Sequence, residues 1–293
     1  MCKRFLWNGE TQVKGKALVV WDILCWPKVA GGLNVIDIYM WNKIAILKHL
    51  WDLNKKKDKL WIVWVHTFYL KGRKPWEVIV NQASWIVRKI LQARHWLEEK
   101  GLQIAEVMET NEFCINAMYK KLRGEYIKVP WRRMTCNNQG SPKWLFALYL
   151  AINRRLYTRD RLARWGITND TLCPLCMEAH ETHQHLFFTC IYSRMLWQKL
   201  LNWLSINRAS NGWTEELNWA VEHASSKTII AEVYRMTLAA IIYYIWQERN
   251  YRIFQNKERN IEMINRAIIQ GIHCRASMIP RFIGFMQKLN FYP

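Results

Sequence analysis

The chain has 293 residues and carries 43 Lys and Arg against 23 Asp and Glu, which gives a net charge of +20. Hydrophobic residues make up 51% of it, which excludes a chain that is disordered by composition, and the length suits two or three modest domains. A positive surplus of this size repels itself unless an acidic partner neutralises it. Nucleic acid or an anionic membrane surface is therefore the expected kind of partner.

The membrane alternative is weak. The longest uninterrupted apolar run, Leu238–Trp246, is about half of the roughly 20 residues that a spanning helix needs. The N-terminus has a basic start but too short an apolar patch for a secretory signal. We therefore expect no membrane association and a nuclear or cytoplasmic location. In such a reducing compartment, clustered cysteines indicate metal or redox chemistry rather than disulfides.

The first half of the chain predicts one short strand followed by helices. An apolar run at Ala17–Ile23 indicates the strand, and apolar residues at helical spacing predict a helix over Ile38–Leu53. The segment Leu60–Leu70 is rich in β-branched and aromatic residues, but its length and neighbours favour a helix. A further helix is expected over Ser84–Lys100, with Ser84 as its N-cap. Turn signals between residues 101 and 142 indicate a linker.

The second half of the chain predicts helices on both sides of a ligand-rich loop. We expect one from Pro142 to about Leu156, and a short one that Thr158 caps and that ends before Gly166. Three amphipathic helices follow, over residues 191–204, 228–255 and 260–278. The 18 tryptophans recur beside Leu and Ile at helical spacing, so most of them are expected in the core rather than in base stacking. The predicted class is mainly α: helical bundles, a small structural zinc-binding module and minor β near the N-terminus.

The ligand-rich loop is "CPLCMEAHETHQHLFFTC", from Cys173 to Cys190. Two thiolates three positions apart, at Cys173 and Cys176, can face one tetrahedral ion, and Cys190 can supply a third. His185 completes a C-x2-C-x8-H-x4-C pattern, although spacing alone does not rank it above His180 or His183. Four N and S ligands leave no position for water, so the site would be structural.

Two other interpretations of this loop, a redox motif and chance clustering, are weaker than the metal site. A CxxC redox motif is expected at a helix start in a βαβ setting, which is missing, and chance clustering leaves the agreement of spacing and ligand type unexplained. Glu181 or Thr182 is expected to cap a helix that carries His185. The segment Gly166–Thr182 has few large apolar residues, so a bound ion would order it.

Several motifs resemble a known family. In this order, "YTRDRLARWGI", "CPLCMEAHETHQHLFFTC" and "YSRMLW" resemble the reverse-transcriptase zinc-binding domain of plant non-LTR (LINE-type) retrotransposons. Earlier pieces such as "WNKIAILKHLW" look like the stretch after the polymerase core, and "IWQERNYRIFQ" is similar to the family's tail. The run "SPKWLFALYLAINRRL" departs from the Lys-and-Phe-rich run that is common in the family.

The resemblance implies a ligand set and a division of the chain. It implies one structural Zn²⁺ held by Cys173, Cys176, His185 and Cys190. It also implies a thumb- or connection-like helical region at 1–136, the zinc-binding domain at 137–210 and a helical tail at 211–293. Such reverse transcriptases hold catalytic metals with two adjacent aspartates, and this chain has no Asp-Asp pair. We expect the endonuclease and polymerase parts upstream of Met1, and no polymerase activity in this chain.

Two functional hypotheses follow. The first is binding of RNA and/or DNA through basic residues beside the zinc site, namely Lys143, Arg154, Arg155, Arg159, Arg161 and Arg164. The second is a structural remnant of a decayed element that packs against the missing polymerase portion. An enzyme is not predicted, because the acidic candidates Glu98-Glu99, Asp160 and Glu215-Glu216 are interpreted as solvated charges and a phosphate-binding Gly-rich loop is missing.

Overall fold

A computed structural model describes residues 18–55, 58–79 and 82–289 of the chain. Within these ranges the protein is mainly helical, and its one β feature is an isolated antiparallel bridge between Leu172 and His180. The mainly α class is therefore confirmed. The strand expected near the N-terminus is wrong in its described part, because Trp21–Cys25 forms helix α2. Helical geometry buries Leu24 and Cys25 together, whereas a strand would place them on opposite faces.

The chain divides into two compact units. One comprises Asn34–Ile127, and the other joins the segment up to Leu33 with the chain from Lys128 onward. The division predicted at residues 136 and 210 stays a prediction.

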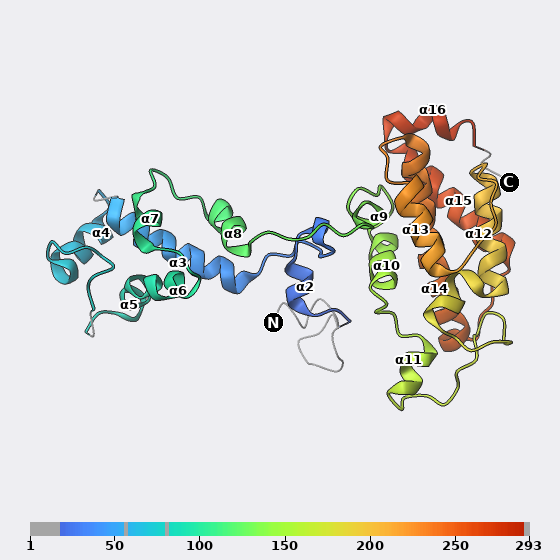
Figure 1. Cartoon of the computed structure of the whole chain (residues 1–293), viewed down its shortest axis with the longest axis horizontal. Coiled ribbons are helices and arrows are strands. Elements are labelled where there is room, and N and C mark those ends of the chain that lie inside the picture. The colour runs from blue at the N-terminus through green and yellow to red at the C-terminus, as the bar shows by residue number, and fades with distance from the viewer. Residues whose placement is uncertain (1–17, 56–57, 80–81, 290–293) are drawn as a thin grey trace. The chain divides into compact units, whose positions relative to one another are not determined.

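The unit Asn34–Ile127 is a small helical assembly around one long helix, α3, which packs against α5, α6, α7 and α8 (Figure 1). Ile44, Leu47 and Leu50 of α3 are fully buried in its core. The helix preference at 60–70 is confirmed, with a π-helical second half. The helix expected from Ser84 is confirmed in two pieces, which meet at Gln92. The helices are α3 Ile38–Lys55, α4 Leu60–Val65, η2 His66–Leu70, α5 Trp85–Leu91, α6 Ala93–Glu99, α7 Ile104–Glu109 and α8 Ile115–Arg123.

The second unit is built around α14 (Ile229–Gln255), against which α10, α12 and α15 pack (Figure 1). The 72% burial of its most apolar window is typical of a core helix, although its length and composition would also let it cross a membrane. The other helices of this unit are α2 Trp21–Cys25, η1 Lys28–Ala30, α9 Arg132–Cys136, α10 Pro142–Ile152, α11 Arg159–Arg164, η3 His185–Thr189, α12 Ile191–Trp203, α13 Trp213–His223, α15 Ile261–Ser277, η4 Pro280–Phe282 and α16 Ile283–Met286.

Most predicted helices of this unit are confirmed, with several differences. Thr158 precedes α11 as predicted, but its hydroxyl donates to Asp160 and makes no cap hydrogen bond to the helix. Helix α10 ends at Ile152 rather than Leu156, and Arg154 just beyond it adopts a left-handed backbone with φ of 51°. Helices α13 and α16 were not predicted. Asn260 caps α15 by accepting a hydrogen bond from the amide of Met263 at 2.8 Å.

Two groups of side chains differ in how well their burial was predicted from the sequence, the tryptophans and the acidic candidates. The tryptophans do pack mainly inside, and the exposed ones among the described residues are Trp26, Trp64, Trp85 and Trp165.

The interpretation of Glu216 as a solvated charge is wrong. This carboxylate is fully buried and accepts hydrogen bonds from Trp197 at 2.9 Å and from both Nη atoms of Arg208 at 2.8 and 2.6 Å. A buried charge that is paired in this way is tolerated in a core.

Candidate metal centre

The ligand-rich loop folds as a short turn held by backbone hydrogen bonds. The amide of Cys173 donates to the carbonyl of Ala179 at 2.7 Å, and the amide of Met177 donates to the carbonyl of Cys173 at 2.8 Å. Met177 has a φ of 58°, a left-handed conformation that lets the chain reverse after Cys176. The bridge between Leu172 and His180 closes the turn. This geometry presents Cys173 and Cys176 on the same side of the loop.

A second segment brings the other two ligand candidates. The hydroxyl of Thr182 accepts a hydrogen bond from the amide of His185 at 3.0 Å, so Thr182 caps the helical turn that carries His185. Of the two caps considered from the sequence, Thr182 therefore takes this role. The π-helical turn η3 follows, and the amide of Cys190 donates to the carbonyl of His185 at 2.7 Å. That bond places Cys190 beside the histidine.

The four side chains form one cluster. One ligand atom from each of Cys173, Cys176, His185 and Cys190 lies within 4.8 Å of all the others. The sulfurs of Cys173 and Cys190 are 3.9 Å apart, and the sulfur of Cys176 is 3.3 Å from Nε2 of His185. Sulfurs bound to a tetrahedral zinc at about 2.3 Å would be roughly 3.8 Å apart, which the first distance matches. A disulfide would need about 2.0 Å, and all three thiols are free.

The other two histidines of the loop are used elsewhere. Nδ1 of His180 lies 2.8 Å from the hydroxyl of Thr171. The ring of His183 packs edge-on against Trp213, with ring centroids 4.3 Å apart, and against Phe187. His185 is therefore the histidine that the structure brings to the three sulfurs, which spacing alone left open.

A hydrogen bond between two of the cluster's sulfurs shifts their pKa values in opposite directions. The Cys173 thiol donates towards the sulfur of Cys190, which lowers the pKa of Cys190 and raises that of Cys173, and burial raises the latter further. Burial lowers the pKa of His185, so its imidazole is neutral at neutral pH and has a free lone pair. A metal ion needs thiolates and a neutral imidazole, so the shifts at Cys190 and His185 favour binding, whereas the Cys173 thiol has to lose its proton when an ion binds. The donor set could therefore hold a metal ion.

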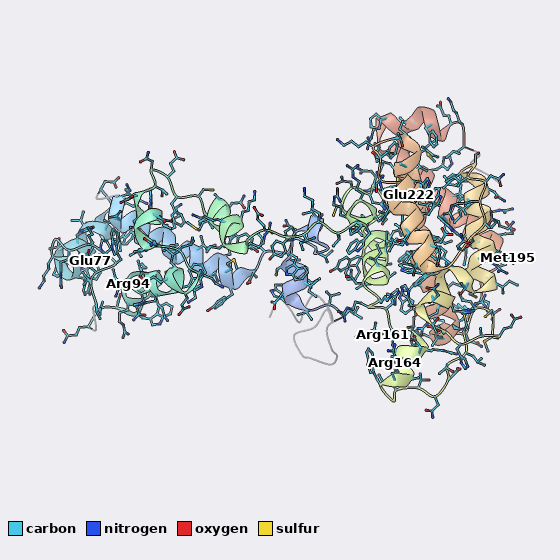
Figure 2. All side chains as sticks on the ribbon, in the orientation of Figure 1. Glu77, Arg94, Arg161, Arg164, Met195 and Glu222 are labelled. Atoms are coloured by element: carbon cyan, nitrogen blue, oxygen red, sulfur yellow. The ribbon has the colours of Figure 1, made fainter. Side chains whose placement is uncertain are left out.

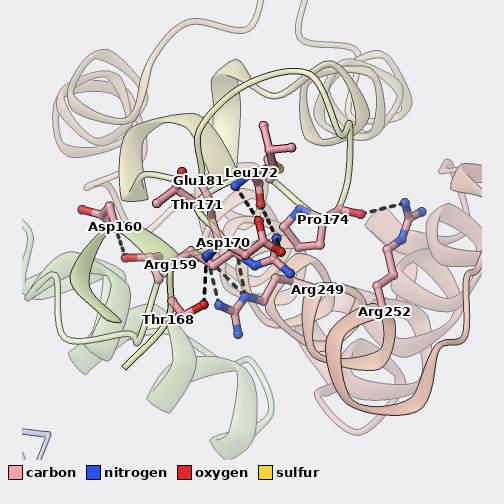
Figure 3. Close-up of polar contacts among 12 residues, drawn as sticks. Arg159, Asp160, Thr168, Asp170, Thr171, Leu172, Pro174, Glu181, Arg249 and Arg252 are labelled. Carbon is pink, nitrogen blue, oxygen red and sulfur yellow. Dashed lines mark hydrogen bonds and ion pairs between the residues drawn. The ribbon is translucent and has the colours of Figure 1, made fainter. Parts of the chain in front are cut away.

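Residues from α14 contact the loop and hold it in place (Figure 3). Nε of Arg249 lies 3.1 and 3.3 Å from the two carboxylate oxygens of the fully buried Glu181. Nη1 of Arg252 donates to the carbonyls of Pro174 and Leu175 at 3.2 and 3.1 Å, inside the turn between the first two cysteines. Glu248 fixes Arg252 through a 3.0 Å ion pair. These contacts were not predicted from the sequence, although charged residues within the largely apolar helix α14 were a usable signal.

The six basic residues predicted to bind nucleic acid have different surroundings. The guanidinium of Arg159 forms an ion pair with Asp170 at 2.7 Å and donates to the carbonyl of Leu172 at 2.6 Å. Arg164 pairs with Asp160 at 3.1 Å, and Lys143 lies over the ring of Tyr243. Arg161 donates to two backbone carbonyls, while Arg154 is exposed and Arg155 partly exposed. The structure thus gathers part of this set beside the loop and places Lys143 on α10.

Comparison with known proteins agrees with this geometry. Residues 113–197 match the family described as zinc-binding in reverse transcriptase. A protein of Arabidopsis thaliana named as a ribonuclease H protein is 28% identical over 96 residues, which is 33% of this chain and 14% of that relative. No solved structure matches the chain significantly. The resemblance to the reverse-transcriptase zinc-binding domain is confirmed for this segment, which contains all four clustered residues.

Proposed function

We propose that this chain, which carries the zinc-binding segment of reverse transcriptases, is a non-catalytic module that holds one structural zinc ion and binds RNA or DNA. The observation that carries the proposal is the cluster of Cys173, Cys176, His185 and Cys190 inside the matched segment. We place its origin in a plant LINE-type element, and its site of action in the nucleus or cytoplasm.

Zinc is the metal that this donor set favours. Three thiolates and one imidazole are soft and borderline ligands, which select zinc over magnesium or calcium. Four protein ligands leave no open coordination position, so the ion would stabilise the fold and would not activate water. The ion would join the Cys173–Cys176 turn to the segment that carries His185 and Cys190.

Nucleic-acid binding is supported by the net charge of +20 and by the basic residues near the loop. The proposed contacts are Lys143, Arg154, Arg155, Arg159, Arg161 and Arg164. Because Arg159 is already paired with Asp170, its proposed part is mainly to hold the neighbouring residues in place. Arginine forks bind phosphate without regard to sequence, and such binding weakens as salt rises. The role would be to grip template RNA or target DNA beside a polymerase portion, which is the proposed protein partner.

The first experiment is elemental analysis of zinc in the purified protein. We expect one zinc per chain, its loss in Cys176→Ser, and its retention in the control Cys274→Ser, which removes an exposed thiol outside the cluster. A folded wild-type chain without zinc would refute the metal part of the proposal. Binding to RNA and DNA oligonucleotides is then measured against salt concentration, and affinity that does not fall with salt would refute the second part.

A second candidate function is an interaction-only remnant, and the unit Asn34–Ile127 favours it. Large apolar side chains are exposed there, including Leu60 at 86%, Ile79 at 78% and Trp85 at 67%. This candidate requires that these side chains lie together on one surface that a partner covers. Analytical ultracentrifugation and thermal melting test this candidate, because a chain that is a soluble monomer and melts cooperatively would contradict it.

A further inference from the structure

A pocket of about 400 Å³ lies between the segment 154–164 and the cap of the His185 helix. Its lining is strongly basic: three of its nine residues are arginines. They are accompanied by hydroxyl, amide and imidazole groups from Thr158, Thr182, Gln184 and His183. Arg161 and Arg164 both project from α11, where Figure 2 labels them. The pocket is a feature of the fold that the metal cluster does not explain.

The positive charge around the pocket is only partly balanced. Asp160 also lines it, but this carboxylate is already engaged by Arg164 at 3.1 Å and by the hydroxyl of Thr158. Neither Arg154 nor Arg161 forms an ion pair with any residue in the described ranges. Two guanidinium charges therefore remain in a concave site, and an anion would offset them.

The guanidinium of Arg161 is held in place before any ligand arrives. Its Nη1 atom donates to the carbonyls of Arg154 and Leu156 at 2.8 and 2.9 Å. Burial and the nearby charges of Arg155 and Arg164 lower its pKa from the ordinary arginine value, in agreement with crowded positive charge. A fork fixed in this way loses little conformational entropy when it binds an oxyanion.

An exposed aromatic ring stands next to the basic residues. Trp165 is 52% exposed, and the guanidinium of Arg161 lies 5.0 Å from the centre of its ring. Tyr157 supports Trp165 edge-on, with ring centroids 5.5 Å apart. An exposed and supported indole beside a basic pocket is the pairing with which proteins bind single strands, whose bases are free to stack.

We propose that this pocket binds a backbone phosphate of single-stranded nucleic acid, with Arg154 and Arg161 as the anion contacts and Trp165 as the stacking platform for a neighbouring base. The inference rests on the proposed nucleic-acid function and sharpens it. These three residues would bind a single strand rather than a duplex, because the bases of a duplex are already stacked on one another. A free phosphate ion would use the same arginines but would have no use for the indole.

The test is fluorescence anisotropy with the zinc-loaded full chain and a labelled 12-nucleotide single strand of mixed sequence, as RNA and as DNA, across a salt series. Variants Arg154→Gln and Trp165→Ala are compared with the wild type. Arg194→Gln is the matched control, since it removes one exposed positive charge from α12 of the same unit. Arg161→Lys tests the fork while keeping the charge, and zinc content and thermal melting verify that each variant is folded.

The variants have distinct expected signatures. Arg154→Gln should weaken binding and reduce the slope of log affinity against log salt by about 0.7, the value for one lost single-strand phosphate contact. Trp165→Ala should weaken binding at least about fivefold with the slope unchanged, since a stacked base contributes about 1–3 kcal/mol. A duplex of the same length should bind without sensitivity to Trp165→Ala.

Three results would overturn the inference. Arg154→Gln and Trp165→Ala could both behave like Arg194→Gln, which would place the strand elsewhere while leaving the proposed function intact. Inorganic phosphate at millimolar concentration could displace the single strand while Trp165→Ala has no effect, which would assign the pocket to a free anion. A wild-type chain that binds no nucleic acid even at low salt would remove the proposed function and this inference together.

Discussion

Arg249 and Glu181 are 68 positions apart in the chain, yet Nε of the arginine lies 3.1 and 3.3 Å from the two carboxylate oxygens. Their side chains are 3% and 0% exposed. Glu181 directly precedes Thr182, the cap of the helical turn that bears His185. This buried ion pair therefore ties the candidate metal loop to the core helix α14, and several expectations about stability and metal affinity follow from such ties.

Replacing Arg249 by Met should destabilise the chain strongly. The Glu181 carboxylate would stay buried without its main counter-charge, and removal of one partner of a buried pair costs about 3–5 kcal/mol. The measurement is the free energy of unfolding from urea titration. The matched control is Arg164→Met, which breaks the exposed pair with Asp160 and should cost only about 0.3–0.5 kcal/mol. Equal effects of the two substitutions would contradict the role of the buried pair.

Replacing Arg252 by Gln should weaken metal binding without removing a ligand. Its two hydrogen bonds to the carbonyls of Pro174 and Leu175 hold the turn between Cys173 and Cys176, and loss of such outer contacts typically lowers metal affinity by about 10–100-fold. Competition with a chromophoric zinc chelator measures the affinity. Arg275→Gln serves as control, because Arg275 also donates to a backbone carbonyl, that of Gln139, away from the loop. Unchanged affinity in Arg252→Gln would argue against this contact.

Removal of the metal should expose the three clustered thiols. In the zinc-loaded chain, the exposed Cys114 and Cys274 are expected to react first with a thiol reagent. After chelation, Cys173, Cys176 and Cys190 should also react, because the ion that coordinates and protects their sulfurs has been removed. A background with Cys2, Cys114 and Cys274 replaced by Ser isolates this change. Thiol kinetics that do not respond to chelation would indicate that the cluster holds no metal.

The stability of the chain should fall in acid partly through Glu248. Burial acts to raise the pKa of this carboxyl, but hydrogen bonds from Arg259 and Arg252 outweigh burial and hold the pKa below the ordinary Glu value. The unfolded chain then takes up this proton at a higher pH than the folded chain, with an ordinary pKa of about 4.3. The contribution of Glu248 is therefore complete above that pH and is lost as the pH falls towards the folded-state pKa.

The variant Glu248→Gln isolates this contribution. Urea titrations of wild type and variant at several values between about pH 5 and pH 3 should give free energies of unfolding that converge as the pH falls. The comparison cancels loss of metal in acid, which both proteins share. Curves that stay parallel through this interval would show that Glu248 titrates alike in the folded and unfolded chains.

The sequence was a good guide where chemistry is local. The gap of two residues between Cys173 and Cys176 predicted a tight turn with two thiolates on one side, and the structure has that turn. Amphipathic spacing likewise located α12, α14 and α15, because a helix that buries one face shows it in its own residues. The cap by Thr182 was one of two local candidates.

The sequence was a poor guide where distant segments meet. Nothing near Glu181 indicates that its partner is Arg249, since a contact between such separated residues exists only after α14 has packed. For the same reason Glu216 was taken for a solvated charge, although Arg208 and Trp197 enclose it. The strand expected at Ala17–Ile23 failed because a short apolar run does not distinguish a strand from a helix.

The position of Arg249 and Arg252 in α14 has a genetic consequence. Both lie more than fifty positions beyond the segment that matches the reverse-transcriptase family, which ends at residue 197. A nonsense or frameshift change anywhere between that residue and α14 would spare all four clustered ligands and still remove the arginines that hold their loop. Such an allele would keep an intact zinc signature in its DNA while encoding a protein that folds poorly around the ion.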